Sequence, residues 1–386
     1  MGRFSLKGYN FRLVFLIVIL NIIGILVINS ASGGSAENVE RQIAGICVGI
    51  VAMGIISFFP YRTLLKFALP IYLVCVGLLA LVLVLGLIHG GARRWIVLPL
   101  LGQIQPSEFV KSGLIVFFAW FLGENADKVS TPRILLLTAL FAAVPLALIL
   151  LEPDLSTTII IAVTIVAMIY VSGISYRIIL ITAAIVVPLV AGFLLLIKNG
   201  ILNLDKYYQI NRILAWFDPS SYTDASQQTS NSIMAIASGK LFGKGLNTES
   251  LSSVKNGNFL PAATTDFIFS VIGEELGFVG CLAVILLFAF IVFECLHMAH
   301  KAQDMEGRII CTGVGVLIAF QSFTNIAVTT GIFPNTGLPL PFVSFGNSSL
   351  LSMYIGVGLA LSTRQAPKNV RKQPRRLLYE NRFSGT

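Results

Sequence analysis

The stretch Phe259–Phe278, FLPAATTDFIFSVIGEELGF, places one carboxylate, Asp266, at the start of a strongly apolar run and two more, Glu274 and Glu275, inside it. An acid just before a helix most simply caps its first turn. Charges about two turns deeper are costly against lipid, so we expect Glu274 and Glu275 to face protein or water. The stretch therefore predicts a membrane-spanning helix that begins at a polar site.

The composition of the whole chain is that of a membrane protein. Of its 386 residues, 56% are hydrophobic and 12% are charged, and the mean hydropathy is +0.85. A soluble domain carries roughly 25% charged residues. The cysteines lie in or at the ends of apolar runs without CxxC spacing, and the histidines form no catalytic cluster, so we expect neither disulfides nor a dedicated metal motif.

Ten segments are long and apolar enough to be membrane-crossing helices, which need about 20 residues. The fourth and the eighth also carry charge, and the first lacks a convincing cleavage site, so it is interpreted as a retained helix. The chain is thus predicted to be an all-α polytopic membrane protein, with residues 1–386 forming one integral membrane domain. The segments are Phe11–Ser30, Ile43–Phe59, Leu69–Ile88, Ser107–Leu122, Ile134–Leu151, Ser156–Val171, Ile178–Ile197, Phe267–Cys295, Ile309–Thr329 and Ser344–Leu361.

Lys and Arg gather in alternate loops, and this bias predicts the orientation. With residues 1–10 as a cytoplasmic tail, the short outer loops hold only Arg41, Arg93 and Arg94. Residues 364–386 become a basic cytoplasmic tail that contacts anionic lipid headgroups and accounts for much of the net charge of +9, and we expect no nucleic-acid partner. Residues 198–266 form a large outer loop between the seventh and eighth helices, with amphipathic pieces such as Ser232–Leu241.

Charged residues flank the start of the fourth predicted helix. Arg93, Arg94 and Trp95 lie in the preceding outer loop. Glu108 and Lys111 follow, and their spacing of three puts both on one side of a helix, where they can pair. Two interpretations stay open: a structural ion pair that lets a polar helix insert, and a charged wall of an outward-facing cavity.

Two further polar stretches lie on the predicted outer side. In EPDLSTT (residues 152–158), Asp154 either caps the sixth helix or forms a second acidic site. In SGKLFGKGL (residues 238–246), glycines with Lys240 and Lys244 suit an anion such as pyrophosphate, although a mobile basic loop fits the same pattern.

The segment after the ninth predicted helix, TTGIFPNTGLPLPFVSFGNSSLL (residues 329–351), contains three prolines and cannot form a regular helix. Irregular backbone at membrane depth must be buried in protein or line a wet cavity. We therefore expect a rigid plug or the lining of an outward-facing pocket, and we include Ser344 among the candidate substrate-binding residues.

Taken together, these motifs resemble the SEDS family (shape, elongation, division and sporulation), which includes the RodA/FtsW-type proteins. The similarity spans nearly the whole chain. It implies ten helices with a large exterior loop, and a peptidoglycan glycosyltransferase that polymerises lipid II at the outer face of a bacterial plasma membrane, together with a class B penicillin-binding protein that crosslinks the strands. The stretches that carry it are GARRWI, QPSEFVK, EPDLSTT, SGKLFGKGL, LPAATTDFIFSVIGEELGFVG and NTGLPLPFVSFGNSSLL.

The resemblance also implies roles for individual residues. The family's essential acid falls on Asp266, which becomes the candidate catalytic base. The substrate-binding candidates are Arg93, Arg94, Trp95, Glu108, Lys111, Asp154, Lys240, Lys244 and Ser344. This chain departs from the family pattern at Ala262, Thr264 and Asn347, and at Glu152, where the usual QPDLGT reads EPDLST. These departures concern the surroundings of Asp266 and the subfamily, for which LFGKGL and SVIGEELGF favour the RodA-like type.

The implied reaction needs a base for the acceptor hydroxyl, charge stabilisation for the lipid pyrophosphate and a path for the lipid. Because the diphosphate is already a good leaving group, one carboxylate suffices as base, and we expect inversion at the donor carbon. A divalent cation (Mg or Mn) is a possible cofactor. Two other functions stay open: a lipid-linked precursor flippase or transporter, and a non-catalytic scaffold for the penicillin-binding protein.

Overall fold

The computed structural model describes residues 9–89, 92–98, 102–198, 208–248 and 260–365. The predicted terminal tails therefore lie mostly outside the described residues, as do parts of the predicted outer loop. The helices are α1 (Phe11–Ala31), α2 (Ala36–Phe58), α3 (Tyr61–Lys66), α4 (Ala68–Leu85), α5 (Pro106–Glu124), α6 (Pro132–Leu151), α7 (Leu155–Val171), α8 (Tyr176–Lys198), α9 (Tyr208–Phe217), α10 (Thr223–Ser238), α11 (Ile268–Lys301), α12 (Met305–Thr329) and α13 (Asn347–Ser362).

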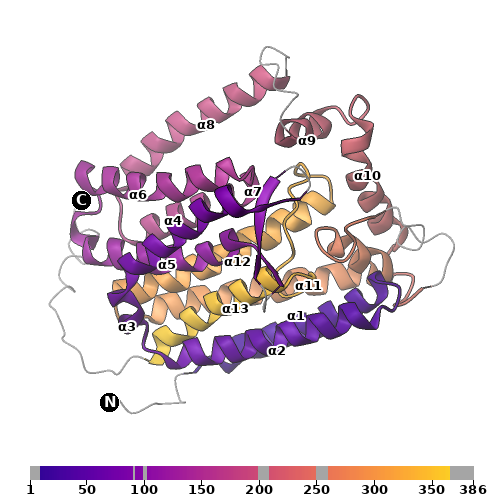
Figure 1. The fold of residues 1–386 in the computed structure, drawn as a ribbon, viewed down its shortest axis with the longest axis horizontal. Coiled ribbons are helices and arrows are strands. Elements are labelled where there is room, and N and C mark those ends of the chain that lie inside the picture. Colours follow the sequence, from indigo (N-terminus) through magenta and orange to yellow (C-terminus); the bar gives the residue numbers. More distant parts are fainter. Residues whose placement is uncertain (1–8, 90–91, 99–101, 199–207, 249–259, 366–386) are drawn as a thin grey trace, which may run out of the picture.

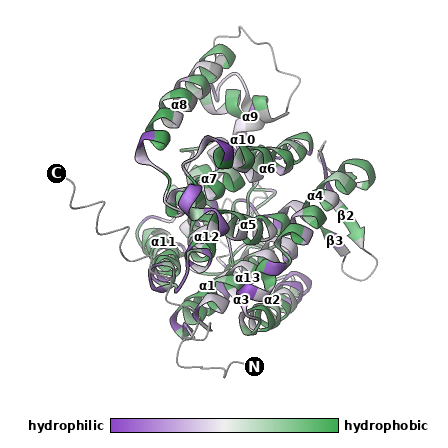
Figure 2. Cartoon of the chain, turned by 90° about the vertical axis from the view of Figure 1, so that its left-hand side faces the viewer, coloured by the Kyte–Doolittle hydropathy of each residue, from purple (hydrophilic) through white to green (hydrophobic). Residues whose placement is uncertain are grey.

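The predicted fold class is confirmed, because the described chain is mainly helical and each of the ten predicted segments coincides with one helix. By length and apolar character, α1, α2, α4, α6, α11 and α12 qualify as membrane spans, and α7 is a shorter apolar helix. The outward faces of these helices are largely hydrophobic (Figure 2), as a bilayer requires. The count of ten spans and the side of the large loop stay predictions.

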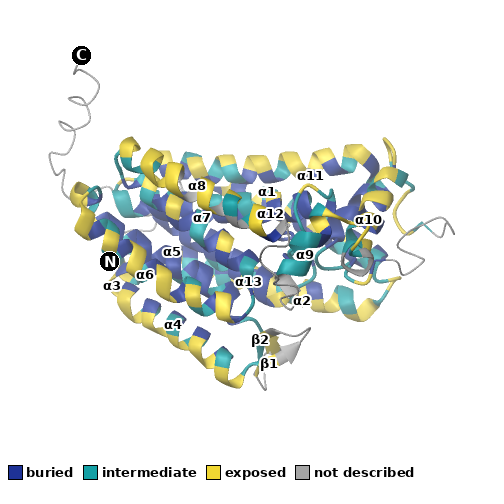
Figure 3. Cartoon of the chain, turned by 90° about the horizontal axis from the view of Figure 1, so that it is seen from above, coloured by how far each residue is buried: buried dark blue, intermediate teal, exposed yellow. Residues whose placement is uncertain are grey.

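The helices form one bundle with α5, α12 and α13 at its centre (Figure 1). Helix α12 packs against α5, α7 and α11, and α13 packs against α2 and α5. Most side chains of α5, α12 and α13 are buried, whereas α4 and α8 expose broad faces (Figure 3). A charged helix such as α5 is thereby surrounded by protein, which is where membrane charges are tolerated.

A small antiparallel sheet covers one end of the bundle, where only a loop was predicted. Strand β2 (Ala92–Leu98) pairs with β1 (Leu87–His89) and with β3 (Gly102–Ile104). The pairing with β1 is irregular, because Leu87 lies opposite Trp95 and Ile88 lies opposite Arg93. Arg94 is therefore the extra residue of a bulge in β2, within the ARRW stretch that the sequence had grouped together.

Helix α11 is broken near its start, where the sequence predicted one continuous helix. Gly277 has φ +65° and ψ −164°, a conformation that only glycine adopts readily. Backbone groups freed by the break are bonded by the segment after α10, because the N–H groups of Phe278 and Val279 donate to the carbonyls of Lys240 and Leu241 at 2.9 and 3.2 Å. The short first part of α11 is thus held by the loop that precedes it.

The proline-rich segment between α12 and α13 is irregular and buried in protein, as predicted. Leu340, Phe342 and Val343 are almost fully buried. The backbone of Val343 passes so close to α1 that a Cβ added at Gly24 would lie 2.8 Å from the Val343 carbonyl oxygen. Phe342 holds a left-handed backbone (φ 63°), a strained state that persists only where the surroundings impose it. The segment is a rigid wall beside the start of α11.

Candidate active site

Asp266 lies in the turn just before α11 and is half-buried. Its backbone is fixed by α12, because the Asn325 amide donates to the carbonyls of Asp266 at 2.8 Å and of Leu338 at 2.7 Å. The predicted capping role is wrong: the residue at the helix start is Phe267, and no side chain caps α11. The carboxylate therefore does not cap α11.

The proline-rich segment clamps the same turn from the other side. The Ser344 hydroxyl donates to the carbonyl of Thr265 at 2.6 Å and accepts from the backbone N–H of Leu340 at 2.7 Å. The N–H of Phe345 donates to the carbonyl of Thr264 at 2.9 Å. Ser344, predicted to bind substrate, is buried and positions the backbone next to Asp266.

Two arginines from different elements influence the Asp266 carboxylate. A Cβ added at Gly337 would lie 3.4 Å from Asp266 Oδ2 and 3.6 Å from Arg212 Nη1, so these two groups face the same small glycine. Arg212 comes from α9 and donates to the Asn335 carbonyl at 3.1 Å. Burial raises the pKa of Asp266, and the charges of Arg212 and Arg94, with a hydrogen bond from Thr265, oppose that rise.

Sequence reasoning missed Arg212. A signal that could have found it is the amphipathic stretch YQINRILAWF (residues 208–217), which carries one cation inside the large predicted loop. Nothing in the local pattern indicated that this cation meets an acid 54 positions later in the chain.

Arg93 and Arg94 of β2 donate hydrogen bonds to different parts of the bundle. Arg94 Nε donates to the Glu152 carbonyl at 3.0 Å, and its Nη2 donates to the Pro153 carbonyl. Arg93 is exposed and donates to the Leu83 carbonyl at 3.3 Å, at the end of α4. Of this group, the structure brings Arg94 into the electrostatic surroundings of Asp266.

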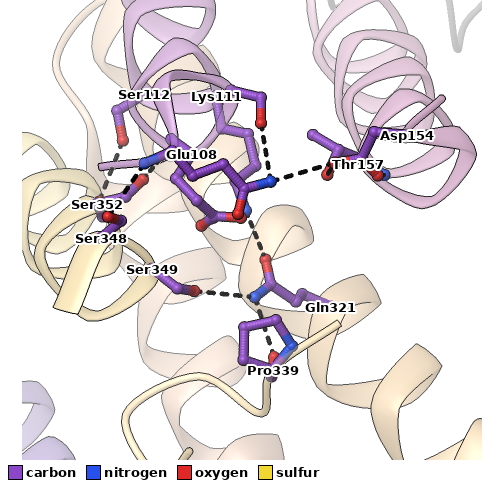
Figure 4. Close-up of polar contacts among 12 residues, drawn as sticks. Glu108, Lys111, Ser112, Asp154, Thr157, Gln321, Pro339, Ser348, Ser349 and Ser352 are labelled. Atoms are coloured by element: carbon purple, nitrogen blue, oxygen red, sulfur yellow. Dashed lines mark hydrogen bonds and ion pairs between the residues drawn. The ribbon is translucent and has the colours of Figure 1, made fainter. Parts of the chain in front are cut away.

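Glu108 and Lys111 form an ion pair inside the bundle, with Nζ 2.8 Å from Oε2 and exposures of 3% and 2% (Figure 4). Lys111 also donates to Gln321 Oε1 of α12 at 2.9 Å. Gln321 in turn donates to the Pro339 carbonyl at 3.1 Å. The predicted pairing of Glu108 with Lys111 is confirmed, and through Gln321 the pair also connects α5 to the proline-rich segment, which was not predicted.

Asp154 caps α7, which confirms the capping interpretation. Its Oδ1 accepts from the Thr157 N–H at 3.1 Å, and its Oδ2 accepts from the Thr157 hydroxyl at 2.9 Å and from the Gln105 amide at 3.3 Å (Figure 4). Neighbouring Glu152 is fully buried, and among the described residues its carboxylate oxygens have no hydrogen-bond partner. Burial and the nearby charge of Asp154 raise the pKa of Glu152 to about 8, against the opposing effect of Arg94.

The two loop lysines differ in their surroundings. Lys244 Nζ lies 2.7 Å from Glu274 Oε1, so its charge is already neutralised by α11. The prediction that Lys244 binds pyrophosphate took no account of this partner, which stands 30 positions away in the chain. Lys240 is exposed. Glu274 and Glu275 are buried and face protein as predicted, and Ser30 of α1 donates to Glu275.

These features define a polytopic membrane protein with a carboxylate–arginine site at one end of its bundle. Within the described residues, no group of three or more His, Cys, Asp or Glu is arranged to hold a metal ion. The family model described as "Cell cycle protein", for FtsW, RodA and SpoVE, matches residues 11–369. The chain belongs to this FtsW/RodA/SpoVE family and is an integral membrane protein.

Relatives and solved structures agree along nearly the whole chain. The chain is 33% identical over 362 residues to the peptidoglycan glycosyltransferase MrdB of Escherichia coli, covering 93% of this chain and 94% of that protein. A chain of a peptidoglycan synthase complex, whose structure concerns the coordination of polymerization and crosslinking, superposes with a TM-score of 0.77 at 30% identity, over 92% of this chain and 97% of that one. RodA of Thermus thermophilus superposes with a TM-score of 0.67 at 27% identity, over 92% and 96%.

Proposed function

We propose that this protein is a peptidoglycan glycosyltransferase that polymerises lipid II, with Asp266 as its general base. The observation that carries the proposal is the position of Asp266, which is held by α12 and the proline-rich segment and faces Arg212. The similarity to MrdB, named as a peptidoglycan glycosyltransferase, supports the class of reaction.

The proposed step is an inverting displacement at the anomeric carbon of the donor sugar. The acceptor hydroxyl gives its proton to the Asp266 carboxylate as its oxygen attacks that carbon. The bond between the carbon and the lipid diphosphate breaks, and the diphosphate leaves with the electron pair. A carboxylate whose pKa is raised by burial is a stronger base than an exposed one, which suits proton abstraction near neutral pH.

Arg212 and Arg94 are the groups best placed to balance the negative charge of the diphosphates. A guanidinium presents its N–H donors in a planar fork that fits paired phosphate oxygens. Arg212 comes from α9 and Arg94 from β2, so both outer elements have to lie over the site when substrate binds. Lys244, paired with Glu274, is assigned a structural role at the break in α11.

We propose a divalent cation only as an ion that binds together with the substrate. Asp266 offers one carboxylate beside two guanidinium groups, and Mg²⁺ prefers several oxygen ligands with few cations nearby. A cation bound here would take most of its ligands from diphosphate oxygens and water, and would supply charge neutralisation for the leaving group. Loss of activity on chelation, restored by Mg²⁺ or Mn²⁺, is the measurement that checks this.

The proposed orientation places both termini in the cytoplasm and Asp266 outside the plasma membrane of a bacterium. Support comes from the Lys and Arg bias of the loops and from the shared end of the bundle at which α1 begins and α13 ends (Figure 1). Residues 198–266 then form the large extracytoplasmic loop. A class B penicillin-binding protein is the proposed partner, because the matched synthase complex coordinates polymerization with crosslinking.

Polymerisation of labelled lipid II by the purified protein in proteoliposomes tests the proposal. Asp266→Asn should lower the rate by about 10²–10⁴, the usual contribution of a positioned base. Asp218→Asn, in the exposed turn after α9, is the matched control and should retain the wild-type rate. Headgroup translocation without polymer would favour a flippase instead. A scaffold would be favoured if Asp266→Asn still supported growth in cells.

A further inference from the structure

A basic cavity lies at the end of the bundle away from Asp266. It has a volume of about 390 Å³ and lies between the start of α1, the end of α11 and the residues after α13. In Figure 2, which looks toward that end, α1 and α11 run side by side. The cavity is lined by Tyr9, Asn10, Phe11, Arg12, Glu294, His297, Lys301 and Arg364.

The charge of this cavity is positive. Arg12 and Lys301 are exposed and Arg364 is half-buried, whereas Glu294 is the one carboxylate of the lining. Glu294 Oε2 accepts from the Asn10 side-chain amide N–H at 2.8 Å, and Asn10 Oδ1 caps α1 by accepting from the Leu13 N–H at 3.3 Å. The Glu294 carboxylate is thus held by Asn10. The positive end of the α1 dipole adds to the positive charge of Arg12, Lys301 and Arg364.

Exposed aromatic side chains flank the cations. Phe11 is 61% exposed and Phe293 is 62% exposed. The Phe293 ring stacks on His297 with centroids 6.0 Å apart, and the Tyr9 and Phe11 rings lie 4.9 Å apart. Aromatic rings beside basic residues at the ends of apolar helices are typical of the boundary between headgroups and acyl chains. A ligand at this place meets cations and hydrocarbon together.

We propose that this cavity binds the phosphodiester headgroup of an anionic phospholipid, with the acyl chains lying along Phe11 and Phe293. Arg12 and Lys301 make the charged contacts, and Arg364 completes the basic lining. Basic pockets between membrane helices are suited to such headgroups. The site takes no part in sugar transfer, because the chain places Asp266 at the opposite end of α11 from Lys301.

Native mass spectrometry of the full-length protein with phosphatidylglycerol, and with phosphatidylcholine of the same acyl chains, tests this site. Wild type should retain phosphatidylglycerol preferentially. The variant Arg12→Gln/Lys301→Gln should lose affinity by roughly fivefold for each charge removed, since a basic residue near anionic lipid contributes about 1 kcal/mol. The control Lys128→Gln/Arg133→Gln removes two positive charges from exposed positions, in the connection between α5 and α6 and in the first turn of α6, and should bind as wild type.

Three results would overturn the proposal. Equal retention of the two lipids by wild type would exclude a headgroup site. Equal losses in both double variants would indicate diffuse attraction to the surface. Displacement of phosphatidylglycerol by inorganic phosphate at equal concentration would indicate a free-anion site without acyl contacts. The charge-keeping variant Arg12→Lys/Lys301→Arg should bind as wild type with an unchanged unfolding temperature, so a folding defect in the first variant would not be mistaken for lost binding.

Discussion

The Glu108–Lys111 pair inside the bundle and the Asp266 site at its end differ in how positive charge balances the carboxylate. Glu108 is paired with a lysine one turn along its own helix, and both are sealed inside the protein. Asp266 meets its arginines from α9 and β2, elements that lie far from it in the chain. The first carboxylate is neutralised by its own helix, whereas burial raises the pKa of the second, and Arg212 and Arg94 oppose that rise. The local pair joins α5 to α12, whereas the proposed base depends on charges that only the tertiary fold brings to it.

The largest effect on stability is expected from breaking the buried pair. Glu108→Gln leaves Lys111 buried without its counter-charge, which typically costs about 3–5 kcal/mol. The double variant Glu108→Gln/Lys111→Met removes both charges and should recover much of that loss. Thermal unfolding in detergent measures both. Equal losses in the single and double variants would mean that the charge itself is unimportant, and Asp266→Asn should not lower stability at all.

Glu152 is expected to make stability depend on pH. Its pKa in the folded protein is about 8, above the ordinary value of 4.5, so the folded state binds the proton more tightly than the unfolded chain. The free energy of unfolding should therefore fall as pH rises from about 4.5 to about 8, and level off above that. Glu152→Gln should flatten this slope in unfolding measurements across the window. An unchanged slope would mean that Glu152 is ionised inside the protein.

Arg212 should set the pH profile of catalysis. Because its charge lowers the pKa of Asp266, Arg212→Gln should move the acid limb of the rate profile to higher pH. On that limb the rate falls about tenfold for each unit by which the pKa rises. Arg93→Gln is the comparison and should shift the profile less, because Arg93 donates to the Leu83 carbonyl at the end of α4. Equal shifts would place both arginines at the site.

The smallest effect is expected at Gly337, which lies against both charged groups. Its φ of +72° is costly for any residue with a Cβ, by about 1–2 kcal/mol. Gly337→Ala should lower stability by that amount, and the added methyl, in van der Waals contact with Asp266 and Arg212, should slow polymerisation more than it weakens lipid II binding. A separate measurement of kcat and KM checks this. A change in KM alone would mean that Gly337 touches only the bound substrate.

The parts of the fold that the sequence predicted are those that depend on local pattern. Apolar length located the helices, such as the segment predicted as Ile134–Leu151 and found as Pro132–Leu151. The spacing of Glu108 and Lys111 was enough to predict that they can pair, and helix-capping preferences predicted that Asp154 caps a helix. The resemblance to a family led to Asp266, whose role still awaits the polymerisation assay.

The parts that the sequence did not predict depend on contacts between distant residues. Arg212 and Asp266 are brought together only by the tertiary fold. Lys244 forms an ion pair with Glu274, which lies 30 positions later in the chain. The bulge at Arg94 depends on the pairing of β2 with β1, which no local pattern within β2 reveals. The break at Gly277 needs the preceding loop to satisfy its backbone, which no periodicity within Phe267–Cys295 reveals.

The contact between Lys111 and Gln321 also has a consequence for how the protein is made. These residues are 210 positions apart, so α5 leaves the ribosome long before α12 exists. Until then Glu108 and Lys111, near the start of α5, have only each other. A charge within an inserted helix costs up to about 3.5 kcal/mol, the value near the helix centre. Helix α5 is therefore expected to linger beside the insertion machinery, or against α4, until synthesis of α12 completes its polar contacts. The centre of the bundle is then assembled late, although its first helix is made early.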